Sequence, residues 1–159
     1  AAIRPGLIKL TQVIIGANTL IQSTLPALLT PNEANGDAAE MKQHNKDYVG
    51  RLEKHALLTC ERLEQIDGLR VVRPGGAMYV MVGVDVDRFE GISNDLEFAQ
   101  QLLTEECVFV IPGSCFRMDN FFRVVFSAPI DKLEEAYSRI AAFCAKRLKP
   151  ERPSKRQKT

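Results

Sequence analysis

The chain is 159 residues long, which suits one ordinary domain, and its 45% hydrophobic and 26% charged residues are typical of a soluble globular protein. This composition excludes collagen-like repeats, coiled coils and wholesale disorder. No apolar run approaches the roughly 18 residues of a membrane span, and no basic-then-apolar leader opens the chain. We therefore expect no membrane partner and a cytoplasmic location, with a mitochondrial one left open.

The net charge of +1 conceals a strong asymmetry along the chain. Residues 146–159 carry seven Lys or Arg and one Glu, whereas the rest of the chain holds 14 basic and 19 acidic residues. Because the body lacks a cationic face, nucleic acid is not expected as a partner. Residues 148–159 contain two prolines and no apolar residue after Leu148, which predicts a basic disordered tail. A short basic run can also serve as an import or polyanion-binding signal.

Residues 1–37 are expected to form connecting helices. Pro5 precedes an apolar helical run over 6–15, where a proline is tolerated in the first turn. Thr19 is a candidate cap for a second helix that reaches about residue 29. Pro26 lies inside this second helix and predicts a kink or an early end.

Residues 38–147 have the pattern of one α+β domain. The domain begins with a long amphipathic helix over 38–66, which Asp67 and Gly68 end. The strands and helices that follow are expected at 69–72, 77–86, 93–106, 108–111, 121–126 and from Asp131 onward. The strand over 77–86 is apolar through its first half, which predicts a central strand covered on both faces. A short, mostly antiparallel sheet with helices packed on one side defines the α+β class.

The motifs of several enzyme classes are absent from the sequence. There is no glycine-rich phosphate loop and no evident set of Ser, His and Asp or of Cys and His. His44 and His55 lie eleven residues apart on the predicted helix, too far to share a metal ion. Asp85 and Asp87 are expected to be solvated residues at a strand end. No metal site is expected, and the cysteines are predicted to be free, buried thiols: Cys60, Cys107, Cys115 and Cys144.

Arg123 stands between the apolar residues 121–122 and 124–126 of a predicted strand. An unpaired guanidinium in such a place is costly, so it needs a partner. From the residues alone three alternatives stay open. Arg123 could form an internal ion pair with Asp or Glu, point outward from an edge strand, or provide a fixed site for the carboxylate of a ligand.

Three segments, in this order, resemble the C-terminal part of fold-type-I, pyridoxal-phosphate-dependent aminotransferases: Pro-Gly-Gly-Ala-Met-Tyr at 74–79, Val-Ile-Pro-Gly-Ser-Cys-Phe at 110–116, and Phe-Arg-Val at 122–124. Within that family the similarity is strongest to the tyrosine aminotransferases, and it runs almost continuously from about residue 3 to 144. The resemblance implies the small C-terminal domain of such an enzyme, over residues 38–147, preceded by helices that pack on a large domain outside this chain.

The resemblance also implies a function. The complete polypeptide would transfer an amino group from an aromatic amino acid to a 2-oxo acid with pyridoxal 5'-phosphate, as a homodimer. Arg123 matches the family's arginine that binds the α-carboxylate of the substrate. Phe116 lies in the loop that lines the mouth of the active site, and Asn18 matches a segment that reaches toward the partner protomer's site.

The lysine that forms the Schiff base in this family has no counterpart in the chain. No catalytic residue is therefore assigned, and this segment alone is expected to be inactive. The cofactor would be bound mainly by residues that this chain does not contain. The alternative is a truncated, non-catalytic relative that acts as a ligand-binding or dimerisation module.

Overall fold

The computed structural model describes residues 3–11, 13, 16–33 and 37–150 of the chain. The chain divides into two compact units, Ala1–Tyr48 and Val49–Thr159, and each is described separately below. The long helix α3 (Asp37–Glu64) runs from the first unit into the second. No described helix is long and apolar enough to cross a membrane. The predicted tail over 148–159 falls mostly outside the described residues.

The first unit holds two short helices, α1 (Ile3–Thr11) and α2 (Thr19–Leu29), and the start of α3. The predicted end of the first helix, at residue 15, lies outside the described residues. Asn18 rather than Thr19 caps α2, because its side-chain oxygen accepts hydrogen bonds from the backbone N–H groups of the first turn. Pro26 does not end α2: the helix continues to Leu29, and the Thr30 N–H donates to the Pro26 carbonyl.

The second unit is built on an antiparallel sheet of four described strands, in the order β1-β2-β4-β3. The strands are β1 (Leu69–Val72), β2 (Tyr79–Val84), β3 (Ile111–Pro112) and β4 (Phe121–Val125). The predicted strand over 108–111 is much shorter in the structure, because only Ile111 and Pro112 pair with β4. The chain leaves the preceding helix through Cys107, whose left-handed backbone (φ 55°) turns it away before it reaches the sheet.

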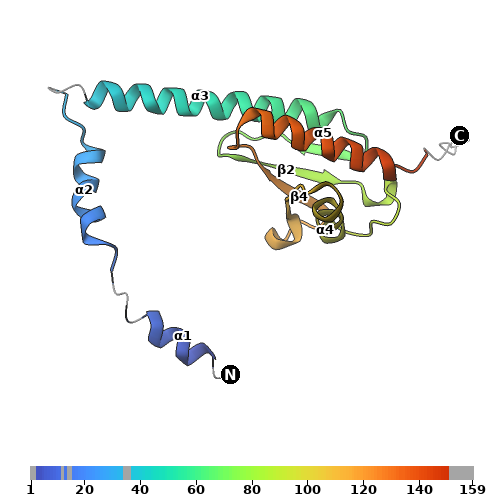
Figure 1. Ribbon diagram of the computed structural model, residues 1–159, viewed down its shortest axis with the longest axis horizontal. Helices are drawn as coiled ribbons and strands as arrows, with labels where there is room; N and C mark the ends of the chain where they lie inside the picture. Colours follow the sequence, from blue (N-terminus) through green and yellow to red (C-terminus); the bar gives the residue numbers. More distant parts are fainter. Residues whose placement is uncertain (1–2, 12, 14–15, 34–36, 151–159) are drawn as a thin grey trace, which may run out of the picture. The chain divides into compact units, whose positions relative to one another are not determined.

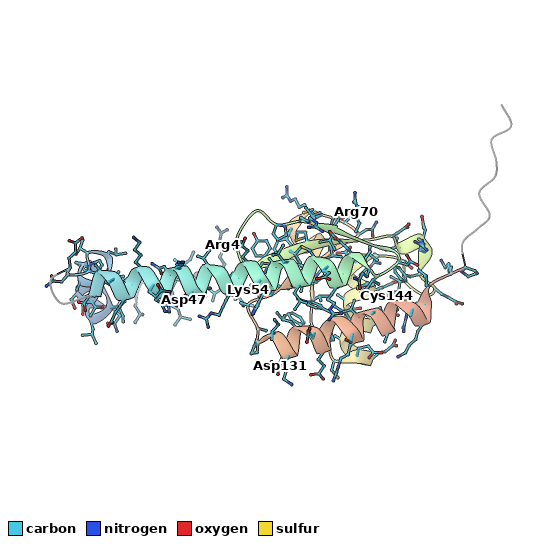
Figure 2. The ribbon with its side chains drawn as sticks, turned by 90° about the horizontal axis from the view of Figure 1, so that it is seen from above. Arg4, Asp47, Lys54, Arg70, Asp131 and Cys144 are labelled. Carbon is cyan, nitrogen blue, oxygen red and sulfur yellow. The ribbon has the colours of Figure 1, made fainter. Side chains whose placement is uncertain are left out.

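Helices α3, α4 (Asp95–Glu106) and α5 (Ile130–Arg147) bury one face of this sheet. Alternate residues of β2 and β4 point into the core, as the period of two requires, with Val80 paired to Val124 and Val82 to Phe122. Helices α3 and α5 run side by side above the strands in Figure 1, and Figure 2 shows the same pair from above. Helix α4 joins the core through Phe98, whose ring stacks on that of Phe122 at 5.1 Å.

The predicted central position of β2 is confirmed, but its predicted cover on both faces is wrong for the described chain. The side chains on the face away from the helices are exposed or half-buried: Tyr79, Met81, Arg123 and Val125. A strand can therefore be apolar on both faces while the described part of the chain covers only one. The uncovered face carries the one charged residue of β4.

Two of the four cysteines depart from prediction. All four are free thiols, as predicted, and Cys60 and Cys144 are buried, but Cys107 and Cys115 are exposed. Cys107 is the residue that ends α4, and Cys115 lies in an exposed turn over residues 114–119, so apolar neighbours in sequence do not bury either thiol. Burial raises the pKa of the Cys144 thiol to about 12, so this thiol stays protonated at neutral pH.

Candidate functional site

Arg123 occupies the middle of β4, an inner strand of the sheet. Met81 of β2 lies beside it on one side and Ile111 of β3 on the other, so Arg123 is not on an edge strand. Its side chain is half-buried on the uncovered face. Within the described part of the chain, no Asp or Glu pairs with its guanidinium. The described structure therefore supports neither an internal ion pair nor an edge position for Arg123.

The guanidinium of Arg123 is held instead by two aromatic rings. Its central carbon lies 4.4 Å from the ring centre of Phe116 and 5.0 Å from that of Tyr79. Both distances are well inside the roughly 6 Å over which a cation is attracted to a ring face. The Nε atom is buried and has no hydrogen-bond partner among the described residues. Neither ring supplies a carboxylate or carbonyl acceptor, so these contacts do not satisfy the hydrogen-bonding capacity of a guanidinium that suits a carboxylate.

Phe116 comes from a tight loop between β3 and β4, the 3-10 turn η2 (Gly113–Phe116) and the residues after it. The loop folds back on itself, since the Met118 N–H donates to the Gly113 carbonyl at 3.0 Å. Gly113 is required by this close approach: a Cβ there would lie 2.3 Å from the Met118 carbonyl oxygen. Arg117 and Asn120 take left-handed backbone angles, with φ of 59° and 61°.

Asp95 ties this loop to helix α4. Its side chain is 2% exposed, and its two carboxylate oxygens accept hydrogen bonds from the backbone N–H groups of Ser114 (2.8 Å) and Asn120 (3.2 Å). Burial alone raises the pKa of this carboxyl, but the hydrogen bonds from Ser114 and Asn120 outweigh it, and the pKa lies below its ordinary value. Asp95 is also the first residue of α4, where the helix dipole favours a negative charge.

Sequence reasoning missed this role of Asp95. Asp95 stands between two polar residues, Asn94 and Glu97, of a type common in the first turn of a helix, and the structure assigns the cap to Asn94, whose side chain accepts from the Glu97 N–H at 2.9 Å. A usable signal was present: an Asp directly after a residue that already caps the helix has its carboxylate free for another partner.

The other residues that the sequence singled out have the following local surroundings. Asn18 caps α2 in the first unit, accepting from Leu20 N–H at 2.9 Å, and its predicted place near a partner protomer's site stays a prediction. His44 is exposed on α3, and His55 Nδ1 lies 2.9 Å from the Phe126 carbonyl oxygen at the edge of the core. The carboxylates predicted to be solvated, Asp85 and Asp87, are exposed.

The described residues do not assemble a site for pyridoxal phosphate or for a metal ion. Gly75 and Gly76 precede a strand, not the helix N-terminus that a phosphate favours. One described lysine, Lys132, lines the groove of about 370 Å³ that Arg123 also borders, and its ammonium group pairs with Glu135 at 3.3 Å. No group of three His, Cys, Asp or Glu side chains among the described residues could hold a metal ion. The cluster fits a carboxylate, and we derive no step through a cofactor from it.

Comparison with known proteins agrees with the fold. Residues 9–140 match the family described as aminotransferase class I and II. The chain therefore belongs to the class I and II aminotransferases.

Several of the relatives that match this chain are tyrosine aminotransferases. The chain is 45% identical to a tyrosine aminotransferase of Dictyostelium discoideum over 139 residues, 87% of the chain and 32% of that protein. It is 40% identical to the tyrosine aminotransferase of Homo sapiens over 144 residues, 89% of the chain and 30% of that protein. The solved structure of tyrosine aminotransferase from Leishmania infantum superposes with a TM-score of 0.72 at 34% identity, over 89% of this chain and 33% of that one. The chain thus spans about a third of the length of these relatives.

Proposed function

We propose that this chain supplies the carboxylate clamp of an aminotransferase that acts on aromatic amino acids. The observation that carries the proposal is the guanidinium of Arg123, which two rings hold with its Nε buried and no acidic partner among the described residues. A guanidinium offers two parallel N–H donors that match the two oxygens of a carboxylate. An amino acid and a 2-oxo acid both carry a carboxylate beside the reacting carbon, so one clamp can serve both substrates.

The clamp contributes binding and orientation. A guanidinium that binds both oxygens of the substrate carboxylate also fixes the direction of the substrate carbon next to it. This orientation lowers the entropic cost of reaching the reactive geometry. Pyridoxal 5'-phosphate, which the family implies, supplies the amino-transfer chemistry when bound. The described residues form no site for this cofactor. In this proposal, the residues that bind it therefore lie in a part of the enzyme outside this chain.

The aromatic donor and the dimeric assembly belong to the same proposal. Five relatives that cover 87–89% of this chain are named tyrosine aminotransferases, which supports tyrosine and similar amino acids as donors. Helices α1 and α2 expose apolar side chains along their length, which supports their packing on a large domain or a second protomer. Examples of these side chains are Leu7, Ile8, Leu20, Ile21 and Leu25.

The proposal is tested in a chimera that replaces the matching 139 residues of the Dictyostelium relative with this chain. We expect transamination from tyrosine to 2-oxoglutarate. Arg123→Lys keeps the charge but loses the two-pronged donor, so the KM of both substrates should rise by about 10- to 100-fold while the cofactor absorbance persists. Arg70→Lys is the matched control, because Arg70 also stacks on a ring, that of Phe121, at 5.4 Å.

The outcomes separate the two readings of the chain. An active chimera whose KM values are unchanged by Arg123→Lys would remove Arg123 from the substrate site. A chimera that binds the cofactor but never transaminates would favour the non-catalytic module. Equal effects of the Arg70 and Arg123 substitutions would show that losing any ring-stacked arginine, and not the clamp, causes the defect.

A further inference from the structure

We propose that Asp95 is a positioning residue for the Arg123 clamp, acting through the loop that carries Phe116. The proposal rests on the proposed function for its effect on substrate binding. Its structural part, the control of the Phe116 ring and through it of the guanidinium, can be measured without any substrate.

The first step is the bridge that Asp95 forms. One buried carboxylate accepts from Ser114 N–H near the start of the loop and from Asn120 N–H at its end, so it closes the loop around Phe116. Each oxygen serves one N–H donor, and bonds from a charged acceptor are about twice as strong as neutral ones. The Asn120 N–H bonds to Asp95 and not to a neighbouring strand, whereas the Asn120 carbonyl accepts a hydrogen bond from the Val84 N–H at 2.8 Å.

The second step is the rigidity of the helix that carries Asp95. Three residues further along α4, the fully buried ring of Phe98 stacks on Phe122 at 5.1 Å and meets Phe143 edge-on at 5.3 Å. Phe122 directly precedes Arg123 in β4. Helix α4 and the clamp strand are therefore packed as one body, and Asp95 extends that body to the loop.

The third step is the chain of contacts from Asp95 to the cation. The loop presents the Phe116 ring at 4.4 Å from the guanidinium, closer than the ring of Tyr79. Phe116 is 42% exposed, so the core alone does not fix its ring. Its place depends on the loop backbone, and the loop backbone is held to α4 by Asp95.

Asp95→Asn is the informative substitution because it keeps size and shape. An amide has one acceptor oxygen, and its NH₂ group would face one of the two backbone N–H donors with no acceptor between them. One end of the loop then loses its anchor. Asn94→Ala is the matched control: it removes the side-chain cap of the same helix, and this side chain has no hydrogen bond to the loop.

The experiment follows the side-chain resonances of Arg123 in the 159-residue chain by NMR. Protons held between two ring faces are shifted upfield. We expect Asp95→Asn to reduce this shift and to raise the Kd of 3-phenylpropionate by about fivefold, as the loss of one ring contact of about 1 kcal/mol predicts. Asn94→Ala should leave both unchanged.

A thermodynamic cycle distinguishes positioning from general loss of stability. If Asp95 acts through Phe116, Asp95→Asn has no further effect on Kd once Phe116 is already Leu, whereas independent effects would add. Ser114→Pro removes the Ser114 N–H that donates to Asp95, and it should reproduce the effect of Asp95→Asn. This second variant keeps the test valid if the first folds poorly.

Three results would overturn the proposal: unchanged Arg123 resonances in Asp95→Asn, additive effects in the cycle, or a wild-type chain without the upfield-shifted resonances. Failure of the proposed function has a different signature. In that case the wild-type chain does not bind the carboxylate at all, while the Arg123 resonances still respond to Asp95→Asn.

Discussion

The two rings around Arg123 predict a measurable share of carboxylate affinity. Replacing Phe116 or Tyr79 by Leu keeps an apolar side chain and removes the ring face that lies 4.4 or 5.0 Å from the guanidinium carbon. Without the rings the Arg123 side chain populates other rotamers, and the fraction of molecules whose guanidinium is placed to bind a carboxylate falls. The apparent Kd rises in proportion to that fall.

The magnitude follows from distance and exposure. Both rings are about two-fifths exposed, at 42% and 40%, so each contact falls between the exposed range of about 0.5–1 kcal/mol and the desolvated value of about 2 kcal/mol. Taking about 1 kcal/mol for each ring, Phe116→Leu and Tyr79→Leu should each raise Kd by about fivefold, and the double variant by about 30-fold.

The assay is an NMR titration of the chain with 3-phenylpropionate, with 3-phenylpropanol as the ligand that lacks a carboxylate. Tyr79→Phe is the matched control, since it keeps the ring and should leave Kd unchanged. The reasoning is refuted if both Leu variants bind as tightly as the wild type, or if the alcohol binds as well as the acid. In either case the rings would not hold the guanidinium for a carboxylate.

Two further predictions concern titration and thiol chemistry. The pKa of Asp95 is lower in the folded protein than in the unfolded one, so its stabilising contribution is complete above the unfolded value near 4 and is lost as pH falls through the folded value. Acid unfolding followed by circular dichroism should therefore show a shallower decline for Asp95→Asn. With Ellman's reagent at pH 8, we expect two thiols of the folded chain to react, Cys107 and Cys115, whereas the buried thiols, Cys144 among them, react only after unfolding. Four rapidly reacting thiols in the folded chain would contradict the structure.

Local sequence signals predicted the elements of the second unit well. Asn94 and Glu97 mark the start of α4, and each takes part in a capping hydrogen bond, Glu97 from Ser93 N–H at 2.8 Å. Gly68 follows α3 with φ of 86°, a backbone angle that glycine adopts readily. Such signals act over three or four residues, so they can be read without knowing the rest of the fold.

Predictions that depended on distant residues succeeded less often. The strand expected over 108–111 contains the right residue types, yet only Ile111 reaches β4, because the turn at Cys107 sets the approach. The cover of β2 and the exposure of Cys115 likewise depend on which elements pack nearby, and no short segment encodes that. Propensity describes a residue's own backbone, whereas burial is a property of its neighbours.

The candidate site shows the same division. The sequence by itself singled out Arg123, since a lone guanidinium in an apolar strand needs a partner, and the resemblance in its motifs pointed to Phe116 and the family. Only the tertiary structure decided what that partner is within the described chain: two rings brought from β2 and the β3–β4 loop, and no carboxylate. Only the tertiary structure, too, brought Asp95 to that loop, because residues far apart in sequence meet where packing puts them, and a single sequence does not record those distances.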